Sequence, residues 1–159
     1  MAKPPVEILI LDSYLATIKN AIGAKIFRNL FARINGKRID ILKNGKLSCA
    51  VFTSAILLMF GLVKESHATV AGLVRDLKTS GWRKITKPRP GAILVWDYKS
   101  YPDGPHLHCG FYIGHDQAIS NSTSKGTPVQ HHWTYGQKNG KVGREIKAIY
   151  WHPKLKKYL

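Results

Sequence analysis

The sequence is poor in cysteine and in acidic residues, and each shortage excludes a class of protein. Its two cysteines, Cys49 and Cys109, are too few for a disulfide framework and lack the spacing of metal ligands. We therefore predict no disulfide scaffold, no metal and no other cofactor. The chain has 25 Lys and Arg residues but only 9 Asp and Glu residues, which gives a formal net charge of +16 at pH 7. This balance indicates a polyanionic partner or surface, such as nucleic acid, anionic lipid or an acidic wall polymer.

Long apolar segments are also missing. The longest apolar run, residues 51–63, contains Thr53, Ser54 and Gly61 and is too short to cross a bilayer, so we predict no transmembrane segment. The N-terminal residues lack the charged-then-apolar pattern of a secretory signal peptide. We therefore expect a protein without its own export signal, cytoplasmic as synthesised.

What is present is typical of one folded domain. A hydrophobic content of 44% and 16 aromatic residues, counted as four Trp, seven Tyr and five Phe, argue against disorder. A chain of 159 residues is long enough to bury about two-thirds of its surface. We predict a single, monomeric domain over residues 1–159. It comprises an N-terminal helix and basic connector (1–44), a core (45–152) and a frayed basic tail (153–159).

Helices are predicted in the first half of the chain. Apolar residues recur every three to four positions over residues 6–34, which indicates one long helix that Gly23 weakens. This helix suits core packing better than a membrane surface, because its aromatic residues are not in excess. A second helix over residues 49–62 is apolar nearly all round, with Ser48 as its N-cap. A third is expected over residues 66–80.

Strands are predicted mainly in the second half. A hairpin is expected over residues 106–122, because apolar runs flank the turn residues 114–117. A short strand is expected within the basic connector at residues 37–42. Further strands are predicted over residues 92–96, 129–135 and 144–152, with a loop over residues 99–105. Helices followed by an antiparallel sheet make an α+β fold.

A cysteine and several polar residues have the placement that thiol chemistry requires. Cys49 falls in the first turn of the second helix, where backbone N–H groups and the macrodipole stabilise a thiolate. His106 and His108 open the hairpin, and Ser120 and Asn121 lie on its second strand, so cross-strand neighbours are about 5 Å apart. Such an arrangement suits thiolate attack, proton transfer by imidazole and a third group that orients the imidazole. A cysteine in an apolar helix could equally be a packed core residue.

Three motifs join these residues. Ser48-Cys49 opens the apolar helix, Pro-Gly-Ala-Ile-Leu-Val-Trp spans residues 90–96, and His-Cys-Gly-Phe-Tyr-Ile-Gly spans residues 108–114. Over residues 45–122 the chain thus resembles the NlpC-type papain-like cysteine peptidases and amidases, a superfamily related to CHAP domains. The resemblance implies a papain-like fold, with the nucleophile at a helix N-terminus packed on an antiparallel sheet. It implies hydrolysis of peptide or amide bonds, often in bacterial cell-wall peptides.

The resemblance also assigns roles. It makes Cys49 the nucleophile and His108 the general base and acid, with His106 as the rival base. Family members usually carry a His, or less often Asn or Gln, on the next strand to orient the catalytic His. Here Asn121 is the first choice and Ser120 the second, because one residue of register moves a side chain to the other face.

Further residues are expected around this centre. The Cys49 N–H is expected to contribute to an oxyanion hole. Cys109 alternates with His108 and should therefore be a small core residue. Expected substrate-binding residues are Ser48, Trp96, His106 and His132. Adjacent strand residues face opposite ways, so His131 and His132, even with His115, do not indicate a metal site.

The favoured function is therefore a bacterial or phage thiol hydrolase that acts on an anionic cell-wall polymer, which the positive charge helps it approach. Reaching the wall would require release by another system. One alternative is a basic module that binds a polyanion or nucleic acid, with a structural Cys49 and with exposed Trp82 and Tyr135 as a stacking platform. The other is a papain-like acyltransferase or deamidase effector, because the acceptor depends on the shape of the cleft.

Overall fold

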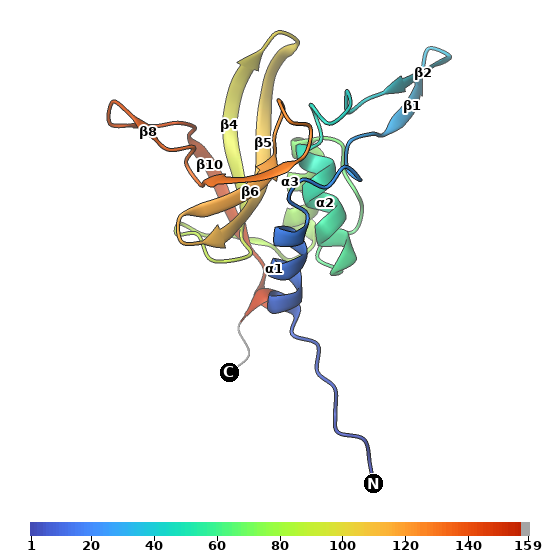
Figure 1. Cartoon of the computed structure of the whole chain (residues 1–159), viewed down its shortest axis with the longest axis vertical. Helices are drawn as coiled ribbons and strands as arrows, with labels where there is room; N and C mark the ends of the chain where they lie inside the picture. Colours follow the sequence, from blue (N-terminus) through green and yellow to red (C-terminus); the bar gives the residue numbers. More distant parts are fainter. Residues whose placement is uncertain (157–159) are drawn as a thin grey trace.

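The computed structural model describes residues 1–156 and has an α+β fold, which confirms the predicted class (Figure 1). Within these residues there are three α-helices, and the central sheet has the strand order β3-β10-β4-β5-β6-β7 with all neighbours antiparallel. The helices are α1 (Ile10–Asn20), α2 (Cys49–Met59) and α3 (Val70–Thr79). The sheet strands are β3 (Arg83–Lys84), β4 (Ile93–Tyr101), β5 (Gly104–Gly114), β6 (Gln117–Asn121), β7 (Pro128–His132) and β10 (Ile146–Trp151).

Two hairpins lie outside the central sheet. They are β1 (Phe31–Ile34) with β2 (Lys37–Asp40), and β8 (Gln137–Lys138) with β9 (Lys141–Val142). A short 3-10 helix, η1 (Pro153–Leu155), follows the last strand. None of the helices within residues 1–156 has both the length and the apolar character needed to span a bilayer.

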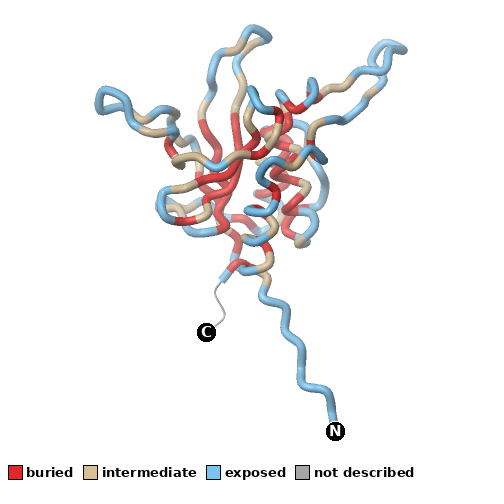
Figure 2. The backbone as a smooth tube through the Cα atoms, in the orientation of Figure 1, coloured by how far each residue is buried: buried red, intermediate tan, exposed pale blue. Residues whose placement is uncertain are grey.

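The main core lies where the helices meet the sheet, and the most deeply buried backbone is found there (Figure 2). Helix α2 is apolar on nearly every side, so it becomes a central buried element rather than a surface helix. Its Phe52 ring packs edge-to-face on Phe111 of β5 at 5.3 Å and on Phe27 at 5.2 Å. Tyr14 of α1 completes the cluster, 5.8 Å from Phe111.

The prediction of one long helix over residues 6–34 was wrong. Helix α1 ends at Asn20, and Gly23 adopts a left-handed conformation with a φ of 77°, which takes the chain out of the helical path. The Gly23 N–H donates to the Pro128 carbonyl at 2.9 Å, so the turn is attached to the sheet. The apolar residues after this turn continue into the β1–β2 hairpin, where a strand was expected only within residues 37–42.

The predicted hairpin over residues 106–122 is confirmed, but its neighbour is longer than expected. Strands β4 and β5 continue through most of residues 99–105, which had been predicted as a loop. A register shift between Trp96 and Lys99 marks a β-bulge in β4, and the paired strands extend beyond it. The proline at position 105 is tolerated because β5 pairs only with β4 there, while β6 pairs with β5 only from Gly110 onward. This outer part of the β4–β5 hairpin extends from the body of the fold (Figure 1).

Two surface predictions also fail. Trp82 was expected to be exposed, but it is buried, and its indole N–H donates to the Leu62 carbonyl at 2.7 Å. The tail over residues 153–159 was expected to fray, but Leu155 of η1 is buried in the main core. Residues 157–159 of that tail lie outside the described residues.

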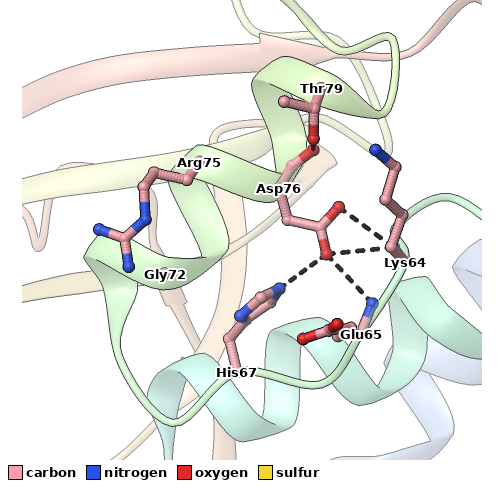
Figure 3. A pocket seen from close by; sticks show the side chains of 7 residues that line it. All are labelled: Lys64, Glu65, His67, Gly72, Arg75, Asp76 and Thr79. Atoms are coloured by element: carbon pink, nitrogen blue, oxygen red, sulfur yellow. Dashed lines mark hydrogen bonds and ion pairs between the residues drawn. The ribbon is translucent and has the colours of Figure 1, made fainter.

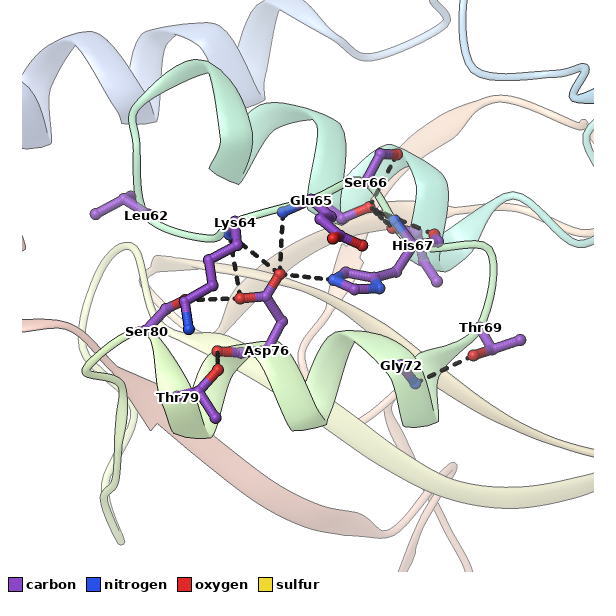
Figure 4. A network of polar contacts seen from close by, with 12 residues as sticks. Leu62, Lys64, Glu65, Ser66, His67, Thr69, Gly72, Asp76, Thr79 and Ser80 are labelled. Carbon is purple, nitrogen blue, oxygen red and sulfur yellow. Dashed lines mark hydrogen bonds and ion pairs between the residues drawn. The ribbon is translucent and has the colours of Figure 1, made fainter.

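A buried carboxylate joins the segment after α2 to α3 (Figures 3 and 4). Asp76 accepts hydrogen bonds from the Lys64 and Glu65 N–H groups at 3.1 Å, from Ser80 Oγ at 2.6 Å and from His67 Nε2 at 2.7 Å. Burial alone would raise the pKa of Asp76, but these hydrogen bonds, that of His67 first, lower it to about 2. The ionised form of Asp76 therefore stabilises this corner of the fold.

We expect Asp76→Asn to lower the free energy of unfolding by about 2 kcal/mol near neutral pH, because the depressed pKa represents differential stabilisation of the folded state. The folded pKa lies below the ordinary value of 3.8, so the stabilisation is complete above about pH 5 and is lost as the pH falls through about 2. Urea unfolding at neutral and acidic pH measures both effects. Glu65→Gln, which changes a neighbouring exposed carboxylate, is the control. A deficit in Asp76→Asn that is independent of pH would contradict the assignment.

Candidate functional site

Cys49 is the first residue of α2, as the sequence predicts, and its side chain is only partly buried. Ser48 occupies the N-cap position, but the expected capping bond is absent: its Oγ is buried and has no hydrogen-bond partner among residues 1–156. The N–H groups of the first helical turn are therefore not taken up by a side-chain cap. N–H groups at a helix start are the kind of donor that can stabilise an oxyanion.

The surroundings of Cys49 favour its thiolate. A hydrogen bond from the Cys109 side chain lowers the pKa of the Cys49 thiol, and a hydrogen bond and the charge of His108 lower it further. Together they outweigh burial, which raises it, so the pKa lies well below its ordinary value. Burial raises the pKa of Cys109, and its Sγ lies 3.5 Å from Thr53 Oγ1, one helical turn beyond Cys49. Cys109 is therefore a core residue, as predicted, but it also borders the candidate nucleophile.

His108 lies on β5 and is held on two sides. Its Nε2 is 2.9 Å from Ser120 Oγ on the neighbouring strand β6. Its ring packs against Trp96 of β4, with centroids 5.2 Å apart. Gly110 is paired with Ser120, and a Cβ at position 110 would lie 2.7 Å from the Ser120 Cβ. The absence of a side chain at Gly110 therefore allows Ser120 to stay within reach of His108.

Ser120 is the centre of a wider hydrogen-bond network. Its Oγ is also 2.7 Å from His131 Nε2 and 3.0 Å from the Tyr135 hydroxyl. Burial, the main cause, lowers the pKa of His131 to about 4, so its imidazole is neutral. Its Nδ1 lies 2.8 Å from the His132 carbonyl and must carry the proton, which leaves Nε2 as an acceptor.

The direction of every bond in this network follows from the neutral His131. Ser120 donates its one hydroxyl proton to His131 Nε2, so its oxygen accepts from His108 Nε2–H and from the Tyr135 hydroxyl. His108 therefore carries a proton on Nε2, and its Nδ1 is the atom free to exchange a proton with a thiol. Tyr135 stacks on the His131 ring at 4.0 Å and covers this network.

Sequence reasoning did not assign His131 and Tyr135 to the site. His131 was weighed as a metal ligand and, in preference, as part of a loop edge that lines the cleft, and Tyr135 only as a stacking platform. The pairing of β6 with β7 brings Val129 opposite Ser120, so His131 lies diagonally from Ser120 on the same face. Residues 129 and 131 of a strand share a face, and this alternation was the feature of the sequence that could have indicated His131 as a neighbour of Ser120.

Asn121, the first choice for orienting His108, points elsewhere. It follows Ser120 on β6 and therefore faces the other side of the sheet. Its Nδ2 donates to the Gly45 carbonyl at 2.6 Å, and its Oδ1 is buried with no partner in the described part of the chain. Asn121 thus attaches the turn before α2 to the sheet, and the geometry favours Ser120 as the residue that orients His108.

The candidate residues line a cavity of about 1300 Å³. Cys49, His108, Ser120, Asn121 and Tyr135 lie along it, and so does His106, whose Nε2 is 3.1 Å from Asp103. The other residues expected to bind substrate do not line it. Ser48 and Trp96 are completely buried, and the His132 Nδ1 contacts Thr134 Oγ1 at 2.9 Å instead.

Positive charge predominates along this cavity. Lys46, Lys99 and Arg144 line it, and the Arg144 guanidinium donates to the carbonyls of Asp97 and His106 on both strands at the bulge. Lys43 also lines it and pairs with Asp103 at 2.7 Å. The walls therefore suit a ligand that carries negative charge.

Comparisons with known proteins leave the family unassigned. No protein-family model matches the chain, and no curated protein matches it in sequence. Within residues 1–156 there is also no group of three or more His, Cys, Asp or Glu side chains that could hold a metal ion. The residues that indicate a chemistry are therefore Cys49, His108 and Ser120.

We expect iodoacetamide to alkylate Cys49 in the folded protein well below pH 8.5, the region in which an ordinary thiol ionises, and to leave the buried Cys109 unmodified. His108→Ala should move the labelling profile toward that of an ordinary thiol, because a main stabiliser of the thiolate is lost. Intact mass measured against time and pH gives the rates.

His106→Ala is the matched control, since it removes a neighbouring imidazole of the same strand, and it should leave the profile unchanged. Equal effects of the two variants, or labelling of Cys49 only after unfolding, would contradict this assignment.

Proposed function

We propose that the chain is a papain-like thiol hydrolase of NlpC type that cleaves peptide or amide bonds, with bacterial cell-wall peptides as its substrate. One observation carries the proposal: a thiol of lowered pKa at a helix N-terminus shares a cavity with an imidazole that a neighbouring strand orients. A purely structural cysteine would require neither the partner imidazole nor access to a cavity.

The first half of the reaction forms a thioester. The Cys49 thiolate attacks the substrate carbonyl carbon, and the electron pair of the carbonyl moves to its oxygen. The N–H groups at the start of α2 donate to this oxyanion. The His108 imidazolium then gives its Nδ1 proton to the leaving nitrogen as the C–N bond breaks, and the amine departs.

The second half releases the acid. Neutral His108 takes a proton from a water molecule, whose oxygen attacks the thioester carbonyl. Collapse of the second tetrahedral intermediate breaks the C–S bond and restores the thiolate–imidazolium pair. Ser120 acts as a positioning residue throughout, because its oxygen accepts from His108 Nε2–H in both protonation states of the ring.

The charge of the cavity supports a carboxylate-bearing substrate. Lys46, Lys99 and Arg144 line its walls, and the only carboxylate among the residues lining it, Asp103, is already paired with Lys43 and His106. A peptide with free carboxylates in an anionic polymer would gain from these cations both in approach and in orientation.

We expect Cys49→Ala and His108→Ala each to lower kcat by about a thousandfold or more, because each removes a group that takes part in bond making or proton transfer. Ser120→Ala should lose about tenfold to a hundredfold, because the imidazole remains but is no longer oriented. Purified cell-wall peptides, with new amino groups counted and products identified by mass spectrometry, give the rates.

His115→Asn, which changes an exposed imidazole that does not line the cavity, is the control and should retain most of the activity. Undiminished hydrolysis by Cys49→Ala would refute the mechanism. Products in which the acyl group has moved to an added amine, without hydrolysis, would instead identify a transferase at the same site.

A further inference from the structure

The hairpin formed by β1 and β2, residues 31–40, extends away from the body of the protein, and we call it the basic arm (Figure 1). Its strands pair with each other from Phe31 opposite Asp40 to Ile34 opposite Lys37, around the turn at Asn35 and Gly36. Almost all of its residues are exposed (Figure 2). A two-stranded hairpin without a packed face is only marginally stable in water, so contact with a further surface would stabilise the arm.

Apolar side chains are exposed on both faces of the basic arm. Ile34 and Ile39 share one face and are 47% and 40% exposed, and Phe31 on the other face is 50% exposed. Leu30 and Ile26, 42% and 81% exposed, continue the apolar surface toward the body. Apolar side chains gathered in this way on an exposed surface are typical of a binding site.

Cations accompany these apolar groups. Arg33, Lys37 and Arg38 are exposed, and within residues 1–156 none of them is paired with a carboxylate. The one acidic residue of the arm, Asp40, is occupied at its base, where it accepts from the N–H groups of Leu30 and Asn44. The Arg38 guanidinium lies 3.7 Å from the Phe31 ring centroid, so cation and apolar group are presented together.

We propose that the basic arm docks on an anionic lipid surface. Ile34 and Ile39, which share a face, would enter the boundary between headgroups and acyl chains. Lys37 on that face, and the long side chains of Arg33 and Arg38 reaching from the other, would bind the lipid phosphates. Nucleic acid would use the cations but would leave the exposed isoleucines without a partner, so the combination favours lipid. Ile41, Lys43 and Lys46 follow the arm directly and line the cavity, so docking would hold the cavity next to the membrane surface.

This inference is independent of the proposed hydrolysis, and its test uses protein carrying Cys49→Ala. Co-sedimentation is measured with vesicles of equal parts phosphatidylglycerol and phosphatidylcholine, and with vesicles of phosphatidylcholine alone. We expect binding to the anionic vesicles, with a loss of about tenfold or more when Arg33, Lys37 and Arg38 are all changed to Gln, since each of these cations is attracted to the anionic headgroups. We expect a comparable loss for Ile34→Ser with Ile39→Ser, which removes apolar insertion but no charge.

A matched control removes three cations elsewhere, at Lys125, Lys138 and Lys141, and should cost much less. The same substitutions are also made in protein that retains Cys49. An unchanged rate of Cys49 labelling there shows that each variant still folds. Equal losses in this control and in the arm variant would mean that net charge alone binds the vesicles, and would overturn the proposal.

Two further outcomes would also overturn it. No binding to the anionic vesicles, with duplex DNA bound and lost in the arm variant, would assign the arm to nucleic acid. A dimer in solution that Ile34→Ser with Ile39→Ser dissociates would assign the apolar face to a second copy of the chain.

Discussion

Helix α2 and strand β5 are joined by the edge-to-face contact between Phe52 and Phe111, and the rest of the site depends on it. Phe52 comes three residues after Cys49, and Phe111 comes three residues after His108. The contact that anchors the two rings therefore also fixes where the thiol and the imidazole stand. Sliding α2 by one helical turn would displace Cys49 by about 5 Å and separate it from His108. The same contact therefore contributes to the packing of the core and to the relative position of Cys49 and His108.

The polar side of the site differs from one built on a buried carboxylate. The hydroxyl of Ser120 orients His108, and a neutral His131 in turn orients that hydroxyl. No buried anion beneath His108 competes for its proton, among the residues that the structure describes. The interaction that the site provides is with Cys49, because a hydrogen bond and the charge of His108 help to lower the pKa of that thiol. Asp76, the buried carboxylate of the chain's other polar network, serves folding instead.

Local patterns in the sequence predicted the α+β class, the helix that Cys49 begins and the hairpin that carries His108, because each depends on residues close together in the chain. The choice between Ser120 and Asn121 depends on one residue of register, which no local pattern determines. His131 and Tyr135 reach Ser120 only through the pairing of β7 with β6 and the turn after it. The prediction of one long helix failed for a different reason. Ile26, Leu30 and Ile34 follow Gly23 at helical spacing, but they are exposed on the β1–β2 hairpin and the segment before it rather than packed in the core.

The strands that extend from the rim of the fold have a consequence for how such a protein diverges. The β1–β2 and β8–β9 hairpins pair only with themselves, and the outer part of β4–β5 lies beyond its bulge. Insertions, deletions or exchanges in them need not disturb Phe52, Phe111 or the residues behind them. Changes in these hairpins can therefore alter the outer surface and the rim of the cavity while the arrangement of Cys49, His108 and Ser120 is kept.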